Sequence, residues 1–298
     1  MFRYLIIAVL SLFLYKADAQ RLKPYILAGY SNDDIVEVKN KVIDKLKTAG
    51  IKVAGSYNPL NSKQRVLIAI TDDNLTKAVK KTGGFRGFAL ALRVALTNEN
   101  NKIMVTYTNP EYWGRAYFQK QWDNVSSYYS ALDKKLRAAL SGFEGDTFVP
   151  FGSKKGVKIS KLKKYHYMIG MPYFKDNITL NTFDSHQNAV STIENNLKNN
   201  ANLKKVYKIS LPDKNMTLFG IGLLGPKGEK HFMPKIDVSS PKHTAFLPYE
   251  LLVLDNKAYM LHGRFRIALS FPDLSMGQFM KISSTPGYIK DRFKEICK

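Results

Sequence analysis

Glu250 is the residue of this sequence best placed to do chemistry, because its carboxylate interrupts an apolar strand. Alternation puts Glu250 on the same strand face as Leu252, so we expect the carboxylate to lie near the core. A buried carboxylate needs a charged or hydrogen-bonding partner. We expect Arg264 and Arg266, on one face of a later strand, to be the nearest partners. The alternative is Arg93, which holds the position of Glu250 in the first half of the chain.

Two roles are open for these four residues. In the structural role, the ion pairs hold the two halves of the chain together. In the functional role, Arg93, Glu250, Arg264 and Arg266 surround a cleft that binds a polar or acidic ligand. An envelope enzyme would use Glu250 as a general acid or base and would need it in an open cleft, whereas a binding or scaffold protein can bury it.

A group of aromatic side chains follows the first predicted hairpin. It consists of Tyr107, Tyr112, Trp113, Tyr117 and Phe118. Such side chains can line a groove for sugar rings or acyl chains, and we take Tyr112 and Trp113 as candidate ligand-binding residues. The alternative is that this spacing forms the hydrophobic face of a helix under a sheet.

Other catalytic and metal-binding patterns are absent from the sequence. Ser153 lacks the surroundings of an esterase elbow, and the glycines from Gly83 to Gly87 lack the Lys and hydroxyl residue of a phosphate loop. The five histidines are scattered, so we expect neither a metal site nor a cofactor. A copper-handling alternative would use His166, Met168 and Met171, since imidazole and thioether groups suit that ion.

The first nineteen residues have the order of a secretion signal. A basic start at Arg3 precedes an apolar run that stops at Lys16, and small residues at Ala17 and Ala19 suit a peptidase. The run is too short to span a bilayer, and no later segment is long and apolar enough to do so. We therefore expect an exported protein of the periplasm or the external medium, with no transmembrane span after processing.

The chain carries a formal net charge of +22, which becomes +21 when the signal and its Arg3, Lys16 and Asp18 are removed. Export argues against nucleic acid as the partner of this basic chain. The candidate partners are then an acidic small molecule, an anionic envelope surface or another protein. The basic residues are mostly lysines, which also fits a solvated surface with no role in recognition. The single Cys297 excludes an internal disulfide.

The order of predicted elements occurs twice. The first half reads as a helix after Ser31, strands over 51–57 and 65–71, a hairpin over 88–108 and helices to residue 140. The second half reads as a helix after Ser185, strands over 204–211 and 216–223, a hairpin with strands up to residue 271 and two short helices. We predict an α+β protein of two similar domains, each an antiparallel sheet with helices packed on one face. The repeats span 20–141 and 165–298, joined by a Lys- and Gly-rich linker over 142–164.

The second hairpin resembles a family. The stretch from Leu247 through Pro248 to Val253, closed by Phe271, Pro272 and Asp273, is similar to the bacterial domain-of-unknown-function family numbered three hundred and two. The first copy, from residue 92 to 110, departs from it by lacking the proline before the strand. The resemblance implies a compact α+β domain, present here in tandem, and it implies no established activity.

The leading hypothesis is therefore an exported, non-catalytic envelope protein that binds a ligand or partner where the repeats meet. The competing hypothesis is an envelope enzyme that uses Glu250 with its arginine neighbours. Copper handling is the third.

Overall fold

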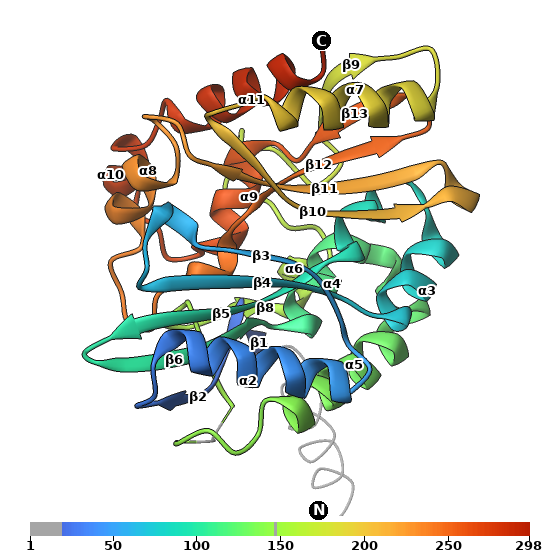
Figure 1. Ribbon diagram of the computed structural model, residues 1–298. Helices are drawn as coiled ribbons and strands as arrows, with labels where there is room; N and C mark the ends of the chain where they lie inside the picture. The colour runs from blue at the N-terminus through green and yellow to red at the C-terminus, as the bar shows by residue number, and fades with distance from the viewer. Residues whose placement is uncertain (1–19, 146–147) are drawn as a thin grey trace, which may run out of the picture.

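The structure is a computed structural model that describes residues 20–145 and 148–298. The secretion signal expected over residues 1–19 lies outside the described residues. Two antiparallel sheets, each with its own helices, form two units of an α+β protein. In Figure 1 the first unit occupies the lower part of the molecule and the second unit the upper part.

The first unit contains a six-stranded sheet with the order β3-β4-β5-β6-β2-β7. Its strands are β2 (Tyr25–Ser31), β3 (Lys52–Tyr57), β4 (Arg65–Thr71), β5 (Leu92–Glu99), β6 (Lys102–Thr108) and β7 (Val149–Phe151). Its main helices are α2 (Ile35–Thr48), α3 (Asp73–Thr82), α4 (Pro110–Phe118) and α5 (Ser126–Ala139). The side chains of Asp34, Asp72 and Asn109 cap α2, α3 and α4, each accepting a hydrogen bond from the first turn.

The second unit contains a five-stranded sheet with the order β10-β11-β12-β13-β9. Its strands are β9 (Ile178–Thr182), β10 (Leu203–Leu211), β11 (Met216–Leu223), β12 (Tyr249–Leu254) and β13 (Lys257–Met260). Its helices are α7 (His186–Lys198), α8 (Glu229–Ile236), α9 (Gly263–Ser270), α10 (Met276–Met280) and α11 (Thr285–Ile296). Figure 1 shows α7 and α11 covering this sheet on the side away from the first unit.

Both units follow the same path. Each begins with a strand, continues through a helix, and then adds four antiparallel strands so that the first strand lies beside the last. The β-bulges also correspond, because β2 and β9 are bulged against the last strand and β3 and β10 against the following strand. The sequence pattern predicts the helix and the later strands of each unit, whereas no prediction was made for β2 and β9.

The boundary segment over 142–164 is built into the first unit. It contains β7, which pairs with β2, and β8 (Val157–Lys158), which pairs with β1 (Arg21–Leu22). The short helix α6 (Ile159–Leu162) follows directly. The six lysines of this segment are all exposed.

The prediction of strands up to residue 271 was wrong beyond Met260, because the chain forms helix α9 there. The alternating letters of Arg264, Phe265, Arg266 and Ile267 mimic a half-buried strand. Two residues apart on a strand share a face, whereas two residues apart on a helix point in very different directions. Arg264 and Arg266 therefore do not share a face: Arg266 is buried and Arg264 is exposed.

The two units exchange short segments. The 3-10 helix η2 (Gly84–Leu90), which precedes β5, packs on β11 and β12 of the second unit. Its counterpart η5 (Thr244–Phe246), which precedes β12, packs on β4, β5 and β6 of the first unit. Each sheet thus buries one face under a segment of the other unit. No helix within the described residues is long and apolar enough to cross a membrane.

Candidate functional site

A buried ion cluster joins the centres of the two sheets. Glu250 on β12 forms ion pairs with Arg93 on β5 and with Nη1 of Arg266 on α9, the latter at 3.0 Å. The Tyr207 hydroxyl donates a hydrogen bond of 2.6 Å to Oε1 of Glu250. The strand registers align Arg93 with Ala69 and Gly55, and Glu250 with Gly220 and Tyr207. Arg93 and Glu250 therefore hold the same position in their two units, as the sequence register predicts.

Arg266 is fixed more rigidly than an ion pair alone requires. Its Nη2 donates to the carbonyl oxygens of Phe246 and Pro248, each at 2.8 Å, and its Nη1 also donates to the Tyr117 hydroxyl at 3.2 Å. The guanidinium carbon lies 5.5 Å from the ring centres of Phe246 and Tyr249. Planar guanidinium groups suit such combined stacking and hydrogen bonding.

The cluster is closed to solvent. Arg93, Glu250 and Arg266 are 1%, 2% and 1% exposed. Burial is the largest single influence on the pKa of Arg93 and lowers it, but the attractions of Glu250, Tyr207 and Tyr117 together outweigh burial and raise the arginine pKa. Burial, followed by the Glu250 charge, raises the pKa of Tyr207 well above its usual value. Within the part of the chain that the structure describes, the group is thus an enclosed set of ion-paired side chains with a neutral phenol, and Glu250 is shielded from solvent.

The other residues proposed from the sequence lie elsewhere. Arg264 is exposed on α9 and does not contact Glu250. Tyr112 and Trp113 are buried on α4, where the Tyr112 hydroxyl donates 2.8 Å to the carbonyl of Leu269 and Trp113 Nε1 donates 2.9 Å to that of Pro24. Both aromatic side chains therefore tie α4 to its surroundings.

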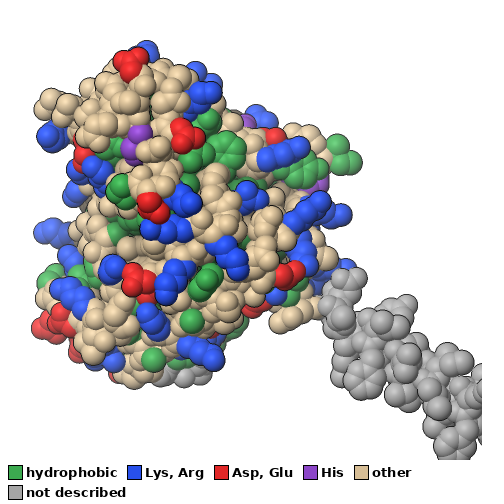
Figure 2. All heavy atoms as spheres, turned by 90° about the vertical axis from the view of Figure 1, so that its right-hand side faces the viewer, with side chains coloured by type: hydrophobic (Ala, Val, Ile, Leu, Met, Phe, Trp, Pro, Cys, Tyr) green, Lys and Arg blue, Asp and Glu red, His purple; other side chains and the backbone are tan. Residues whose placement is uncertain are grey.

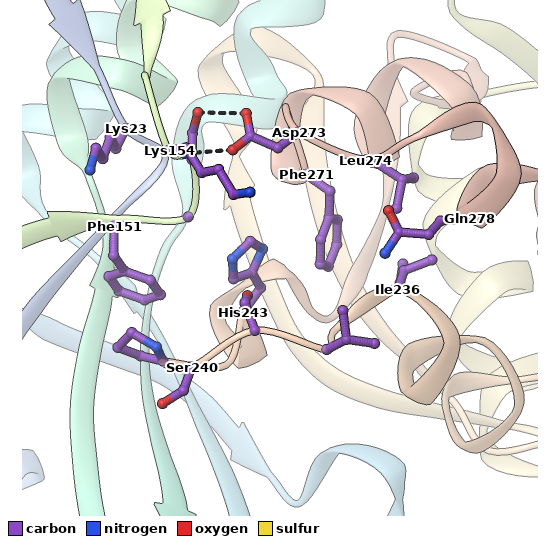
Figure 3. A pocket seen from close by; sticks show the side chains of 15 residues that line it. Lys23, Phe151, Lys154, Ile236, Ser240, His243, Phe271, Asp273, Leu274 and Gln278 are labelled. Atoms are coloured by element: carbon purple, nitrogen blue, oxygen red, sulfur yellow. Dashed lines mark hydrogen bonds between the residues drawn. The ribbon is translucent and has the colours of Figure 1, made fainter.

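A pocket of about 320 Å³ opens where the units meet, and we call it the seam pocket. The first unit contributes Lys23 and the loop after β7, and the second contributes the end of α8, the segment before η5 and the turn between α9 and α10. Figure 3 shows its walls, formed chiefly by the following side chains: Lys23, Phe151, Lys154, Ile236, His243, Phe271, Asp273, Leu274 and Gln278. The lining mixes rings and aliphatic groups with a few polar groups, as small-molecule sites do.

The charged groups that line the seam pocket differ in whether they have hydrogen-bonding or ionic partners. The Asp273 carboxylate accepts hydrogen bonds from Ser153 Oγ at 2.8 Å and from the Lys154 backbone N–H at 2.5 Å. Within residues 20–145 and 148–298, no carboxylate lies in salt-bridge range of the Lys23 or Lys154 ammonium group. The pocket therefore presents an excess of positive charge at its rim.

His243 stands in the middle of the seam pocket. Its ring is stacked on Phe271 with centroids 4.6 Å apart and lies 5.9 Å from the Phe151 ring. Figure 3 shows the imidazole between these two side chains. Burial lowers its pKa, against the opposing charge of Asp237, so the imidazole is neutral near pH 7. Among the described residues its buried Nδ1 has no partner at hydrogen-bond geometry, but a backbone hydrogen bond with Ser270 opposes the fall in the pKa of the ring. A buried polar atom without a good partner is costly.

Two further buried carboxylates of the second unit reach into the first. Glu229 accepts hydrogen bonds from the Tyr57 hydroxyl and the Leu60 N–H, both at 2.9 Å, and from the Leu223 N–H at 3.0 Å. Burial nevertheless raises the pKa of Glu229 to about 7. Asp237 accepts from Arg65 Nη1 at 2.7 Å. Glu229 and Asp237 were not predicted as site residues, because polar and apolar residues are mixed around them in the sequence and no alternation indicates burial.

The described residues hold no group of three or more His, Cys, Asp or Glu side chains placed to bind a metal ion. The residues of the copper hypothesis are also occupied otherwise. His166 Nδ1 lies 2.9 Å from the carbonyl oxygen of Met168, and its ring packs on Tyr173 with centroids 4.4 Å apart. Met171 lines an apolar pocket beside α9 and α10.

Basic side chains are spread widely over the surface. On the face shown in Figure 2, lysines and arginines are scattered among fewer acidic side chains and do not form one continuous patch. The high net charge therefore does not by itself mark a site on this face.

Comparisons with known proteins add a partial likeness to a solved structure. No protein-family model matches the chain, and no curated protein matches it. Among solved structures, the uncharacterized conserved protein DUF302 from Bacillus stearothermophilus is similar to part of it, with 13% sequence identity and a TM-score of 0.32. The likeness covers 39% of this chain and 91% of that one.

Proposed function

We propose that this protein is an exported, non-catalytic binding protein that takes a small acidic ligand in the seam pocket. The observation that carries the proposal is the pocket itself, in which the buried imidazole of His243 lies between two phenyl rings. Lys23 and Lys154 line the same pocket and have no carboxylate in salt-bridge range within the part of the chain that the structure describes. A ligand with a flat apolar body, an anionic group and a hydroxyl would meet each of these features.

The buried state of Glu250 favours binding over catalysis. A general acid or base must reach the proton that it transfers, directly or through a water molecule. Glu250 is 2% exposed and its carboxylate is held by two arginines and a tyrosine. The geometry therefore fits the structural role for the ion cluster, and we assign ligand binding to the residues of the seam pocket at the same junction.

We further infer that the chain arose by tandem duplication of one unit of the resembled family. The common strand order, the corresponding bulges and the equivalent positions of Arg93 and Glu250 support this origin. Export to the envelope is supported by the order of charge and hydropathy in the first nineteen residues.

The test is ligand binding by the mature chain, residues 20–298. Native mass spectrometry of the purified protein would reveal a co-purified small molecule. In titrations, we expect 4-hydroxybenzoate to bind at least about tenfold more tightly than phenol, because only the acid engages Lys23 and Lys154.

Two variants locate the binding. Lys154→Gln and His243→Phe should each weaken 4-hydroxybenzoate binding about tenfold, while Lys155→Gln, next in the chain but not in the pocket lining, should not. Equal binding of the acid and phenol, or binding that none of the pocket variants changes, would sink the proposal.

A further inference from the structure

A second, apolar pocket lies on the other side of Leu274 from the seam pocket, within the second unit. Its volume is about 300 Å³. Its walls come from α9, α10 and the segment before β9, and they include Met171, Ile267, Met276, Phe279 and Met280. Arg264 and Ser283 are its polar members. Met276 and Met280 are 50% and 60% exposed, so flexible thioether side chains form the mouth of the pocket.

A basic cavity of about 680 Å³ adjoins this apolar pocket. Arg264 again lines it, together with Lys290 and Lys294 of α11 and the hydroxyl residues Ser283 and Ser284. Arg264 and Ser283 line both spaces, so the apolar pocket and the basic cavity meet at these two residues.

The basic cavity carries little compensating negative charge. Among the described residues, neither Arg264 nor Lys294 has a carboxylate in salt-bridge range, and Lys290 lies 4.0 Å from the exposed Asp291. Asp176 is near enough to act on the charge of His262, which also lines the cavity. Three cations therefore face one open space, and the carboxylates near it among the described residues are those of Asp291 and Asp176, so positive charge is in excess and favours an anion there.

We propose that these two spaces together bind one molecule of a single-chain anionic amphiphile. Its alkyl chain occupies the apolar pocket, and its phosphate or carboxylate lies in the basic cavity against Arg264, Lys290 and Lys294. Each space alone would suit an apolar or an anionic molecule, and their junction at Arg264 and Ser283 requires both properties in one ligand. This site is separate from the seam pocket and does not depend on the function proposed for it.

The probe is decyl phosphate, titrated below its micelle concentration into the mature chain, with decanol and inorganic phosphate as its two parts. We expect one-to-one binding of decyl phosphate at least about tenfold tighter than that of either part. If decyl phosphate binds no more tightly than both parts, or if the protein sediments with anionic vesicles but shows no one-to-one binding, the proposal is overturned.

Variants separate the two halves of the site. Arg264→Gln should weaken decyl phosphate binding about tenfold, and Met276→Glu, on an exposed side chain, should weaken it at least as much by placing charge in the chain pocket. The control is Arg292→Gln, the same substitution on α11, the helix that carries Lys290 and Lys294, at a residue that lines neither space. The seam-pocket variant Lys154→Gln should bind decyl phosphate like the wild type. Equal losses in Arg264→Gln and Arg292→Gln would refute the site.

Discussion

Three buried carboxylates of the second unit, those of Glu229, Asp237 and Glu250, fix the junction between the units residue by residue. Each reaches a group of the first unit: Tyr57 and Leu60 for Glu229, Arg65 for Asp237 and Arg93 for Glu250. Removing water from a carboxylate is costly unless hydrogen bonds and opposite charges replace the water. The main effect of these pairings is therefore to specify which surfaces of the two units meet. Their net contribution to the folding free energy is small.

Glu229 makes the stability of the protein depend on pH. Its pKa is about 7 in the folded state, above the ordinary value of 4.5 expected after unfolding, so the folded state binds the proton more tightly. The sign follows directly: stability from this group is present in acid and is lost as the pH rises through 7. Between pH 5 and pH 8 we expect Glu229 to lower the unfolding free energy by about 2 to 3 kcal/mol.

Urea denaturation of the wild type and of Glu229→Gln at both pH values tests this. The amide keeps most of the hydrogen bonds of Glu229 but cannot titrate. The change in unfolding free energy between pH 5 and pH 8 should therefore differ between Glu229→Gln and the wild type by about 2 to 3 kcal/mol. His243 has the opposite effect on the pH dependence of stability, because burial lowers its pKa. This contribution is the same in the wild type and in Glu229→Gln, so it cancels in the comparison. The control is Glu194→Gln. Burial raises the pKa of the Glu194 carboxyl, but hydrogen bonds from Lys205 and Lys208 outweigh burial and lower it, so this group does not titrate between pH 5 and pH 8. The change in unfolding free energy between these pH values should therefore match that of the wild type. A Glu229→Gln profile parallel to the wild type would contradict the assignment.

The residues of the ion cluster could be predicted from the sequence, whereas the seam pocket could not. Glu250 and Arg93 stand out because each interrupts an apolar, alternating strand, and the doubled order of elements placed them in register. His243 and Asp273 lie in irregular segments, where no periodicity indicates which way a side chain points or whether it is buried. Their meeting with Lys23 and Lys154 depends on how the two units dock, and no local pattern encodes that.

At the level of elements, the sequence predicted the strands that lie between turn residues and missed those before helices. β2 and β9 each lead directly into a helix whose cap, Asp34 or Ser185, dominates the local pattern. β9 has only five residues, with polar Asn181 and Thr182 at its end. Helix α9 was mistaken for a strand because it is buried on nearly all sides, so its hydrophobic residues show no helical period.

Gly55 sets how closely the edge strands β3 and β10 can approach. Figure 1 shows these strands side by side where the units meet. A Cβ on Gly55 would lie 2.0 Å from the backbone oxygen of Val206, so Gly55→Ala must push the two edges apart. We expect a loss of about 2 kcal/mol or more in unfolding free energy, as for other overpacked sites.

The matched control is Gly277→Ala on α10, where a Cβ would meet nothing within 4 Å. Alanine should be neutral there or stabilise the helix by up to about 1 kcal/mol. Thermal melting of both variants decides between the two expectations. If Gly55→Ala melts with or above the wild type, the close approach of β3 and β10 is not a constraint on the fold.

For the molecule as a whole, the exchange of η2 and η5 makes each unit a part of the core of the other. Tyr107, which pairs with Val94, reaches Asp133 of α5, so that face of the first sheet is covered by its own helices. Arg93 and Thr97 point to the opposite face, where they meet Glu250 and Thr244 of the second unit. The inner faces of both sheets are therefore apolar surfaces with embedded charges, and the partner unit supplies part of their cover.

We accordingly predict that the halves do not fold separately, although each has a complete strand order. Residues 20–164 alone would lose the cover that Tyr259 gives Phe85 and that Leu252 gives Gly87, and would leave Arg93 without its carboxylate. Residues 165–298 alone would expose Glu250 among apolar side chains. Neither fragment should show a cooperative thermal transition by circular dichroism, whereas the mature chain should unfold in one step. Mixing or co-expressing the fragments should restore a one-to-one complex with a cooperative transition, because the exchanged segments supply the missing cover. A half that melts cooperatively by itself would mean that its inner sheet face is stable in water, and the junction would then be a docking contact between finished domains.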